Sequence, residues 1–394
     1  MAKARTVLVS AFLVASVSVS HAQKSVLDCN LEPLADALTR IKDKQTVQFT
    51  GVCSGPVVIR VDGLTLTGVG TAAIDGAGQD ALTVAGASNV TLSGFEVLNG
   101  LNGIVGSNGA HVALKNLTSR NNTRSGIALQ TGSSAVLEDV TVSTNGLHGL
   151  DAGNGSAVTV TGELTASANR VFGINVNGSS ITFAQATVVA SGNALGIQIA
   201  TSANAFINDS ATTINVTNNL ATGLTVVSGA HLVSFGGTIN ASGNAGVGVS
   251  VNSKAGLDLD AGSTLTSTGN GDGVLVQQGS VMTVFNTPQF SGAPGFSTVN
   301  ANQNTRTGVR VLTSSTLTLS NQARLVANQN GTVGLVGDNG ASVTLVNSTI
   351  TGNSARDIQL TFGPRADLRT LTFGTATCDA TALVRGTAGI TCPQ

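Results

Sequence analysis

The sequence predicts an all-β solenoid, because asparagines recur along it at a nearly constant interval and each interval repeats one pattern of short strands. The interval is 23 to 26 residues, apart from one step of 34 residues between Asn270 and Asn304. A glycine usually follows four residues later and opens a Gly-Ile-x-Val-like run. Such a period indicates one supersecondary unit per repeat, stacked on its neighbours. The recurring residues are Asn99, Asn122, Asn145, Asn169, Asn193, Asn219, Asn244, Asn270, Asn304, Asn330 and Asn353.

Composition is the third observation that favours this fold. The 394 residues include 49 Gly and only 6 Pro, with neither Trp nor Tyr and 10% charged side chains. A chain rich in Val, Thr, Ser, Asn and Gly suits short strands joined by tight turns better than helices. The net charge of −1 leaves no basic surface of the kind that binds nucleic acid, so no nucleic-acid partner is expected.

One repeat, from Gly126 to Asn145, shows how a coil is built. Ile127 and Leu129 alternate with smaller residues, a Gly-Ser-Ser turn follows, and apolar positions then return at every second residue or so. This alternation predicts short strands with one face against a narrow interior. Leucine-rich repeats have a similar period but a fixed Leu-x-x-Leu-x-Leu spacing that is missing here.

Asparagine at one fixed place in every coil has a physical explanation. Asn tolerates left-handed backbone angles at a tight corner, and its amide can bond to the equivalent amides above and below. We therefore expect a structural Asn ladder. A row of ligands for a metal or sugar is the alternative, but a buried corner needs these amides for its own hydrogen bonds.

The first 22 residues have the pattern of a secretory signal peptide. Lys3 and Arg5 precede an apolar stretch, and Ser20-His21-Ala22 offers a small-x-small cleavage site. The stretch is shorter than the ~20 apolar residues of a spanning helix. We expect a secreted or periplasmic protein with no membrane insertion after cleavage.

Four cysteines lie outside the repeats, two near each end. Of the three possible connectivities, Cys29–Cys53 with Cys378–Cys392 is the economical one, because it closes short loops at the exposed ends of a solenoid. Close Cys-x-x-Cys or Cys/His spacing, which a zinc site needs, is missing from the sequence. Neither a metal nor a cofactor is expected.

The repeats, together with the segments that precede them, resemble the right-handed parallel β-helix of the pectin-lyase-like superfamily. The opening stretches Leu34-Ala-Asp-Ala-Leu-Thr-Arg-Ile, Thr46-Val-Gln-Phe-Thr-Gly and Leu64-Thr-Leu-Thr-Gly-Val-Gly are similar to the first coils of its secreted carbohydrate-binding and sugar-hydrolase-type members. The resemblance covers about residues 57–373. It implies about 11 to 13 coils of 23–26 residues.

Both ends of such a stack need a cover, because open strand edges invite aggregation. Leu34, Leu38 and Ile41 fall at i, i+4 and i+7, which predicts an amphipathic capping helix from Glu32 to about Lys44. The expected organisation is a signal peptide at 1–22, an N-terminal cap with a disulfide at 23–56, a β-helix at 57–373 and a C-terminal cap with a disulfide at 374–394.

Charged side chains concentrate in three successive coils. Lys115 and Glu138 occupy the same position of adjacent coils and should form an exposed pair. The simple interpretation is a solvated salt-bridge ladder. The functional one is an acidic-sugar site with Arg120 or Arg124 as charge clamp, His148 as base and Asp151 orienting it. The full set is Lys115, Arg120, Arg124, Glu138, Asp139, His148, Asp151 and Arg170.

Two other segments carry candidate functional residues. Asp258 and Asp260 alternate with leucines, so both carboxylates should face outward, with Asp272 near the next coil; solubilising charges and a calcium site are the two interpretations. The 34-residue step contains Pro288 and Pro294 and should protrude as a loop. Its aromatic residues, Phe290 and Phe296, are either a sugar platform or a packed loop.

These observations favour an exported monomeric scaffold that presents a polar face to polysaccharide or protein. A polysaccharide lyase or glycoside hydrolase with a minimal site is the alternative. The polygalacturonase-type motifs Asn-Thr-Asp, Asp-Asp and Gly-His-Gly are missing, and turns are short for an enzyme of this fold. A structural adhesin would differ by needing an anchor or translocator. A polysaccharide panel scored for binding and for bond cleavage separates these classes.

Overall fold

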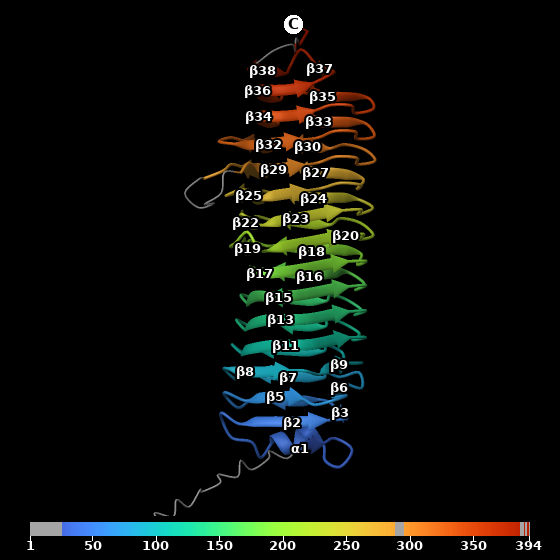
Figure 1. Ribbon diagram of the computed structural model, residues 1–394, viewed down its shortest axis with the longest axis vertical. Helices are drawn as coiled ribbons and strands as arrows, with labels where there is room; N and C mark the ends of the chain where they lie inside the picture. Colours follow the sequence, from blue (N-terminus) through green and yellow to red (C-terminus); the bar gives the residue numbers. More distant parts are fainter. Residues whose placement is uncertain (1–25, 288–294, 387–389, 391, 394) are drawn as a thin grey trace, which may run out of the picture.

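A computed structural model describes residues 26–287, 295–386, 390 and 392–393, in which the chain winds as a tall stack of parallel strands (Figure 1). Neighbouring strands in the stack come from successive coils. The stack contains a 14-stranded sheet and a 24-stranded sheet. With ~4.8 Å between rungs, fourteen rungs extend about 60 Å.

The 14-stranded sheet, called sheet B, holds the Gly-Ile-x-Val runs and takes one strand from each coil. Its strands are β4 (Val57–Ile59), β7 (Leu82–Ala85), β10 (Ile104–Ser107), β12 (Ile127–Leu129), β14 (Leu150–Gly153), β16 (Phe172–Asn177), β18 (Leu195–Ala200), β21 (Leu224–Val227), β24 (Val247–Asn252), β27 (Asp272–Val276), β30 (Val309–Leu312), β33 (Val333–Asp338), β35 (Arg356–Thr361) and β37 (Ala376–Cys378).

The 24-stranded sheet, called sheet A, consists of two ladders joined by long strands. The first ladder comprises β1 (Leu27–Asp28), β2 (Thr46–Thr50), β5 (Thr65–Gly68), β8 (Val90–Ser93), β19 (Asn204–Ile207), β22 (His231–Phe235), β25 (Gly256–Asp260), β28 (Val281–Val284), β31 (Thr316–Leu319) and β38 (Leu383–Gly386). The second ladder comprises β3 (Val52–Ser54), β6 (Ala73–Asp75), β9 (Glu96–Leu98), β20 (Thr213–Thr217), β23 (Thr238–Ser242), β26 (Thr264–Thr266), β29 (Ser297–Asn300) and β32 (Ala323–Val326). Strands that run through both ladders are β11 (His111–Arg120), β13 (Ser134–Ser143), β15 (Ala157–Ser167), β17 (Ser180–Ser191), β34 (Ser342–Ile350) and β36 (Arg365–Phe373).

The corner between the two ladders is a single residue with positive φ. Asn116 (φ 49°) and Asp139 (φ 55°) occupy it in β11 and β13. Asn and Asp adopt this left-handed conformation more readily than most residues, so the strand turns there without a loop. Inside the stack, aliphatic side chains form continuous columns. Ile104, Ile127 and Leu150 are in register and have no exposed surface.

An asparagine ladder runs along the corner that precedes sheet B, from Asn122 to Asn353. Each asparagine donates its backbone N–H and its Nδ2 to the Oδ1 of the next one, at 2.8–3.2 Å. Asn99 lies outside this ladder. It is exposed, and the backbone N–H of Gly100, the following residue, donates to Asn122 Oδ1 at 2.9 Å.

Asp357 ends the ladder at its C-terminal side. Its Oδ1 accepts hydrogen bonds from Asn353 Nδ2 at 2.8 Å and from the Asn353 N–H at 3.2 Å. Its Oδ2 accepts from the N–H groups of Gly374 and Thr375 at 2.7 and 2.9 Å. Burial raises the pKa of this carboxyl, but the hydrogen bonds from Asn353, Thr375 and Gly374 outweigh it and lower the pKa below its ordinary value.

At the N-terminal end, α1 (Leu34–Leu38) lies beneath the first strands (Figure 1). It is much shorter than the predicted segment of residues 32–44. The Thr39 hydroxyl donates to the Asp36 carbonyl at 2.7 Å, a local bond typical of a helix end. Leu34 and Leu38 are buried in the core, and Ile41 is partly buried against it.

The disulfides Cys29–Cys53 and Cys378–Cys392 are formed, as predicted. The predicted boundaries at residues 56 and 373, however, do not interrupt the stack. Strands β2 and β3 already pair with the following coil, and β37 and β38 continue both sheets. The stack therefore has more rungs than the 11 to 13 predicted, because its first and last coils lack the ladder asparagine. The predicted signal peptide lies outside the described residues.

Candidate functional site

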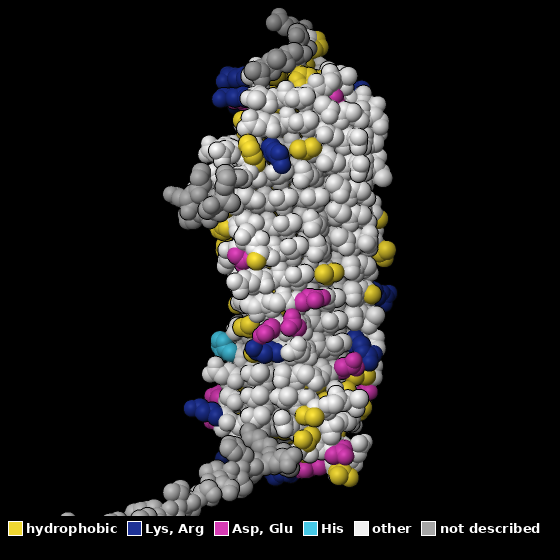
Figure 2. Space-filling view, in the orientation of Figure 1, with side chains coloured by type: hydrophobic (Ala, Val, Ile, Leu, Met, Phe, Trp, Pro, Cys, Tyr) yellow, Lys and Arg dark blue, Asp and Glu magenta, His cyan; other side chains and the backbone are white. Residues whose placement is uncertain are grey.

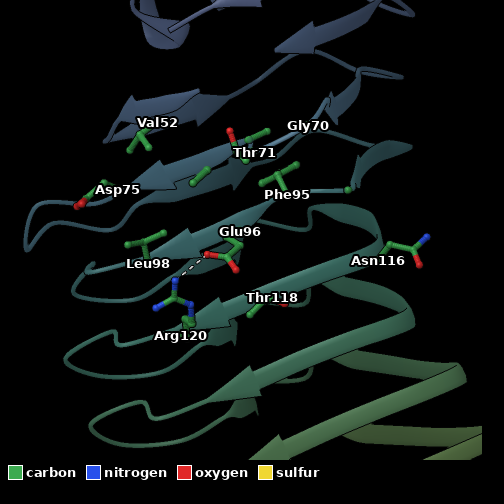
Figure 3. A pocket seen from close by; sticks show the side chains of 13 residues that line it. Val52, Gly70, Thr71, Asp75, Phe95, Glu96, Leu98, Asn116, Thr118 and Arg120 are labelled. Carbon is green, nitrogen blue, oxygen red and sulfur yellow. Dashed lines mark hydrogen bonds and ion pairs between the residues drawn. The ribbon is translucent and has the colours of Figure 1, made fainter. Parts of the chain in front are cut away.

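The outer surface of sheet A is hollowed near its N-terminal end, where β3, β6, β9 and β11 lie side by side. We call this hollow, which has a volume of about 750 Å³, the N-terminal groove. Its floor comes from outward side chains of the second ladder, including Val52, Ala73 and Thr118. Gly70 and Thr71, in the segment between β5 and β6, line it where that coil passes from one ladder to the next (Figure 3). The volume falls in the range of small-molecule sites, ~300–1,000 Å³.

Three charged side chains line this groove: Asp75, Glu96 and Arg120. Arg120 on β11 reaches across one rung to Glu96 on β9, with Nη2 and Oε2 2.8 Å apart (Figure 3). Asp75 on β6 is held by the N–H of Ala77 and by Asn99 Nδ2, each at 2.9 Å from its carboxylate. Two carboxylates against one guanidinium leave the groove with a charge of −1.

The Glu96–Arg120 pair stays accessible to solvent. The two side chains are 44% and 38% exposed, so the pair itself contributes only ~0–1 kcal/mol to stability. Its oxygens and nitrogens remain open to a ligand. Phe95, the groove's aromatic residue, is only 4% exposed and offers no stacking surface. The groove therefore offers hydrogen-bonding groups rather than an aromatic surface.

Glu96 and Asp75 are not among the residues predicted from the sequence. Glu96 is 24 residues before Arg120, one coil spacing, so aligning the coils would have placed the two charges on adjacent rungs. Asp75 lies in a coil that has no ladder asparagine, so its position could not be aligned with the other repeats.

The predicted cluster from Lys115 to Arg170 is divided among three surfaces. Lys115 pairs with Glu138 at 2.7 Å on the first ladder, as their positions predicted. Arg120 lies in the N-terminal groove on the second ladder. Asp139 lies at the corner between the two ladders, in β13. The other four predicted residues lie on sheet B or in the turns before it: Arg124, His148, Asp151 and Arg170. Arg120 and His148 thus belong to different parts of the coil, the end of β11 and the turn before β14.

Acidic side chains gather in the middle of the sheet A face, over β13 and β15 (Figure 2). They include Glu138, Asp139 and Glu163, and Asp139 Oδ1 accepts the Glu163 N–H at 3.1 Å. This part of the surface is therefore less suited to an anionic ligand than the sequence suggested.

His148 is almost buried at the entry to β14. It is 8% exposed, its ring centroid lies 5.3 Å from that of Phe172, and its Nδ1 accepts the Phe172 N–H at 3.4 Å. Burial lowers the pKa of His148; Asp151 opposes this and Arg124 adds to it. Asp151 itself accepts a hydrogen bond from Asn175 Nδ2 at 2.8 Å, and Gln198 continues the row by donating to Asn175 at 3.1 Å. Burial thus favours the neutral form of His148, and the described hydrogen bond of Asp151 is to Asn175.

The three aspartates from the calcium hypothesis lie in different environments. Asp258 is on the outer face and bonds to His231 Nε2 at 3.0 Å. Asp260, predicted to face outward, is 2% exposed, because its carboxylate accepts the N–H groups of Ala261 and Thr287 where the chain leaves β25. Asp272 is on sheet B. Within residues 26–287 and 295–386, no group of three or more His, Cys, Asp or Glu side chains is arranged to hold a metal ion.

In the predicted protruding loop, Pro288, Phe290 and Pro294 lie outside the described residues. The ring of Phe296, 45% exposed, lies 5.7 Å from the guanidinium carbon of Arg324. None of the helices described is long and apolar enough to cross a membrane.

The family described as the right-handed β-helix region matches residues 57–220 and 102–270, together more than half of the chain. The chain belongs to this right-handed β-helix family. The family assignment agrees with the two stacked parallel sheets and supports the resemblance to pectin-lyase-like proteins. A search of curated proteins finds no match.

Two solved structures with similar folds come from Azotobacter vinelandii. One is the A-module of the mannuronan C-5 epimerase AlgE4, 16% identical, with a TM-score of 0.53 over 90% of this chain and 93% of that one. The other is the A-module of AlgE6, 17% identical, with a TM-score of 0.51 over 89% and 93%. At this identity the likeness concerns the fold alone.

Proposed function

We propose that this β-helix is an exported scaffold that binds a neutral, hydroxyl-rich polysaccharide in the N-terminal groove. The observation that carries the proposal is the groove itself, a hollow of about 750 Å³ that presents two carboxylates and one guanidinium on adjacent rungs. Sugar hydroxyls donate to carboxylates and accept from guanidinium groups, and charge-assisted hydrogen bonds are the stronger ones. The two disulfides are consistent with export.

The charge of the groove argues for a neutral ligand. The carboxylates of Asp75 and Glu96 would repel an acidic chain, and Arg120 is already neutralised by Glu96. We therefore place an anionic glycan elsewhere than at Arg120. The mannuronan epimerases with the same fold act on a polysaccharide, which supports a polysaccharide ligand in general without specifying the sugar.

Glu96→Ala tests the groove, and Glu138→Ala is its matched control. Both glutamates are about equally exposed and pair with a basic residue one rung away, Arg120 and Lys115, at 2.8 and 2.7 Å. Both changes alter the net charge equally. Calorimetric titration with a panel of neutral oligosaccharides should show binding weakened about tenfold by Glu96→Ala, as expected for the loss of a charged hydrogen bond of ~1.5 kcal/mol. Glu138→Ala should bind like the wild type.

Equal binding by both variants would contradict the groove as the site. Binding of acidic but not neutral oligosaccharides would contradict the neutral ligand.

A glycoside hydrolase is the second candidate, because Asp75 and Glu96 are two carboxylates that line one groove. Hydrolysis of a glycosidic bond needs such a pair as acid and base or nucleophile. The assay is the release of reducing ends from each glycan that binds. Product formed by the wild type and lost in both Asp75→Asn and Glu96→Gln would favour the enzyme over the scaffold.

A further inference from the structure

Sheet B carries a second polar centre, far along the stack from the N-terminal groove. Asp272 opens β27, and its side chain is only 3% exposed. Arg306, in the turn before β30, donates from Nη2 to Asp272 Oδ2 at 2.9 Å. Arg310, on β30, approaches the same oxygen with Nη1 at 3.4 Å, and the N–H of Thr307 donates to Asp272 Oδ1 at 3.1 Å.

The local sequence makes room for this arrangement. A Cβ at Gly271 would lie 2.5 Å from the Gly246 carbonyl oxygen and 3.1 Å from Arg306 Nη2. The glycine therefore leaves space both for the neighbouring backbone and for the guanidinium of Arg306. Arg310 is in register with Leu275 on one side and Val336 on the other, so it is the charged member of an otherwise aliphatic stretch of the outer surface.

The charges of this centre do not balance. One buried carboxylate faces two guanidinium groups, which leaves an excess of one positive charge. The Arg306 and Arg310 side chains are 59% and 38% exposed, and each guanidinium has five N–H donors, of which the described hydrogen bonds to Asp272 use one. Neutralising Asp272 requires only one arginine. Arg306 Nη2 already donates to Asp272 Oδ2 at 2.9 Å, and the Thr307 N–H donates to Asp272 Oδ1 at 3.1 Å, so both carboxylate oxygens have a partner without Arg310.

A shared carboxylate also restrains both arginines. A free surface arginine loses side-chain entropy when it binds a ligand, whereas a guanidinium already held by Asp272 loses less. Guanidinium donors fit the oxygens of carboxylates and sulfates in a bidentate manner. The two guanidinium groups are thus restrained, partly exposed and in excess over the carboxylate, which are the properties that suit the binding of an anionic group.

We propose that Arg306 and Arg310, held by Asp272, bind a sulfate or carboxylate group on the outer surface of sheet B. The site is independent of the N-terminal groove, which is on sheet A. Two arginines of this kind can bind either a free anion or an anionic substituent of a polysaccharide, and the experiment below distinguishes the two ligands.

The test is titration of the full chain with sodium sulfate and, separately, with a sulfated and a uronic-acid oligosaccharide, at constant ionic strength. Nuclear magnetic resonance of the arginine side-chain N–H groups reports the contact directly. We expect saturable shifts at Arg306 and Arg310, and at least a fivefold loss of affinity in Arg310→Gln. This variant keeps the 2.9 Å Arg306–Asp272 contact and should fold normally.

Arg324→Gln is the matched control, because it removes the same charge from sheet A, where Arg324 contacts Phe296 and Thr298. Arg306→Gln is a second test variant, checked by its melting curve. If both oligosaccharides bind much more tightly than inorganic sulfate, the natural ligand is an anionic substituent of a polysaccharide. If the oligosaccharides and sulfate bind with equal affinity, the ligand is a free anion. Absence of saturable shifts in the wild type, or equal losses in Arg310→Gln and Arg324→Gln, would overturn the proposal.

Discussion

Asn193→Ala removes one link from the middle of the asparagine ladder, and its cost can be worked out from the contacts of that link. Asn193 has no exposed surface. Its Oδ1 accepts the backbone N–H and the Nδ2 of Asn169 at 2.9 and 3.0 Å, and its Nδ2 donates to the Ala166 carbonyl at 3.0 Å. Its Nδ2 also donates to Asn219 Oδ1 at 3.2 Å. The variant takes these partners from two buried donors and two buried acceptors, although Asn219 Oδ1 keeps the Asn193 backbone N–H at 3.0 Å.

Each buried polar group that loses its partner costs ~1–3 kcal/mol, and neighbouring losses are partly shared. We therefore expect Asn193→Ala to lower the free energy of unfolding by about 3–5 kcal/mol. The measurement is urea denaturation followed by circular dichroism, together with glycan binding at low urea. Binding in the N-terminal groove, several rungs away, should be unchanged, because coils of a solenoid interact mainly with their nearest neighbours.

Asn240→Ala is the control, because it breaks a bond of the same kind on the surface. Asn240 Nδ2 donates to Asn215 Oδ1 at 2.9 Å, but both side chains are half-buried and water can replace the lost partner. We expect a loss of about 0.5–1 kcal/mol there. If Asn193→Ala were no more destabilising than Asn240→Ala, or if it abolished glycan binding while stability was intact, the structural role assigned to the ladder would be wrong.

Two further predictions concern pH. Because the folded-state pKa of Asp357 is lowered, its stabilisation is present above the unfolded-state pKa and is lost as the pH falls through the folded-state pKa. Asp357→Asn should therefore lower the free energy of unfolding at pH 7 by about 2 kcal/mol or more, because charged hydrogen bonds are lost. In urea denaturation, the difference in free energy of unfolding between variant and wild type should become smaller in acid. A difference that does not change with pH would contradict the role of an ionised Asp357 at the end of the ladder. The hydrogen bond to Asp258 raises the pKa of His231 above its ordinary 6.5, so this pair stabilises the fold fully below about pH 6.5 and less as the pH rises through the folded-state pKa. Asp258→Asn should cost under about 1 kcal/mol at pH 5.5, because the pair is partly exposed, and almost nothing at pH 9; an equal cost at both values would exclude the charged pair.

The sequence determined the architecture of this protein because the architecture is local and repeated. Each coil has a buried corner whose polar groups are hydrogen-bonded by one asparagine amide, so asparagines recur at the length of a coil. Asn122, Asn145 and Asn169 show this interval in the sequence. The same register predicted the Lys115–Glu138 pair, and the position of the cysteines predicted both disulfides. Asn99 is shifted by one residue from the ladder position, and the sequence alone wrongly placed it in the ladder. The first and last coils lack the asparagine, and the sequence alone therefore predicted too few rungs.

Only the tertiary structure decided which charged residues share a surface. Each coil turns through three strands, so residues close in sequence can belong to different parts of it: Arg120 ends β11 in sheet A, and Arg124 lies in the turn before β12 of sheet B. Residues one coil apart, such as Glu96 and Arg120, meet instead. The burial of Asp260, and the sharing of Asp272 by Arg306 and Arg310, depend on where backbone N–H groups and neighbouring turns lie around each carboxylate. The alternation of apolar and polar residues along a strand predicts which side of the sheet each side chain faces. At the end of a strand it does not predict which group the side chain contacts, because the chain turns there and the contacting group comes from another coil.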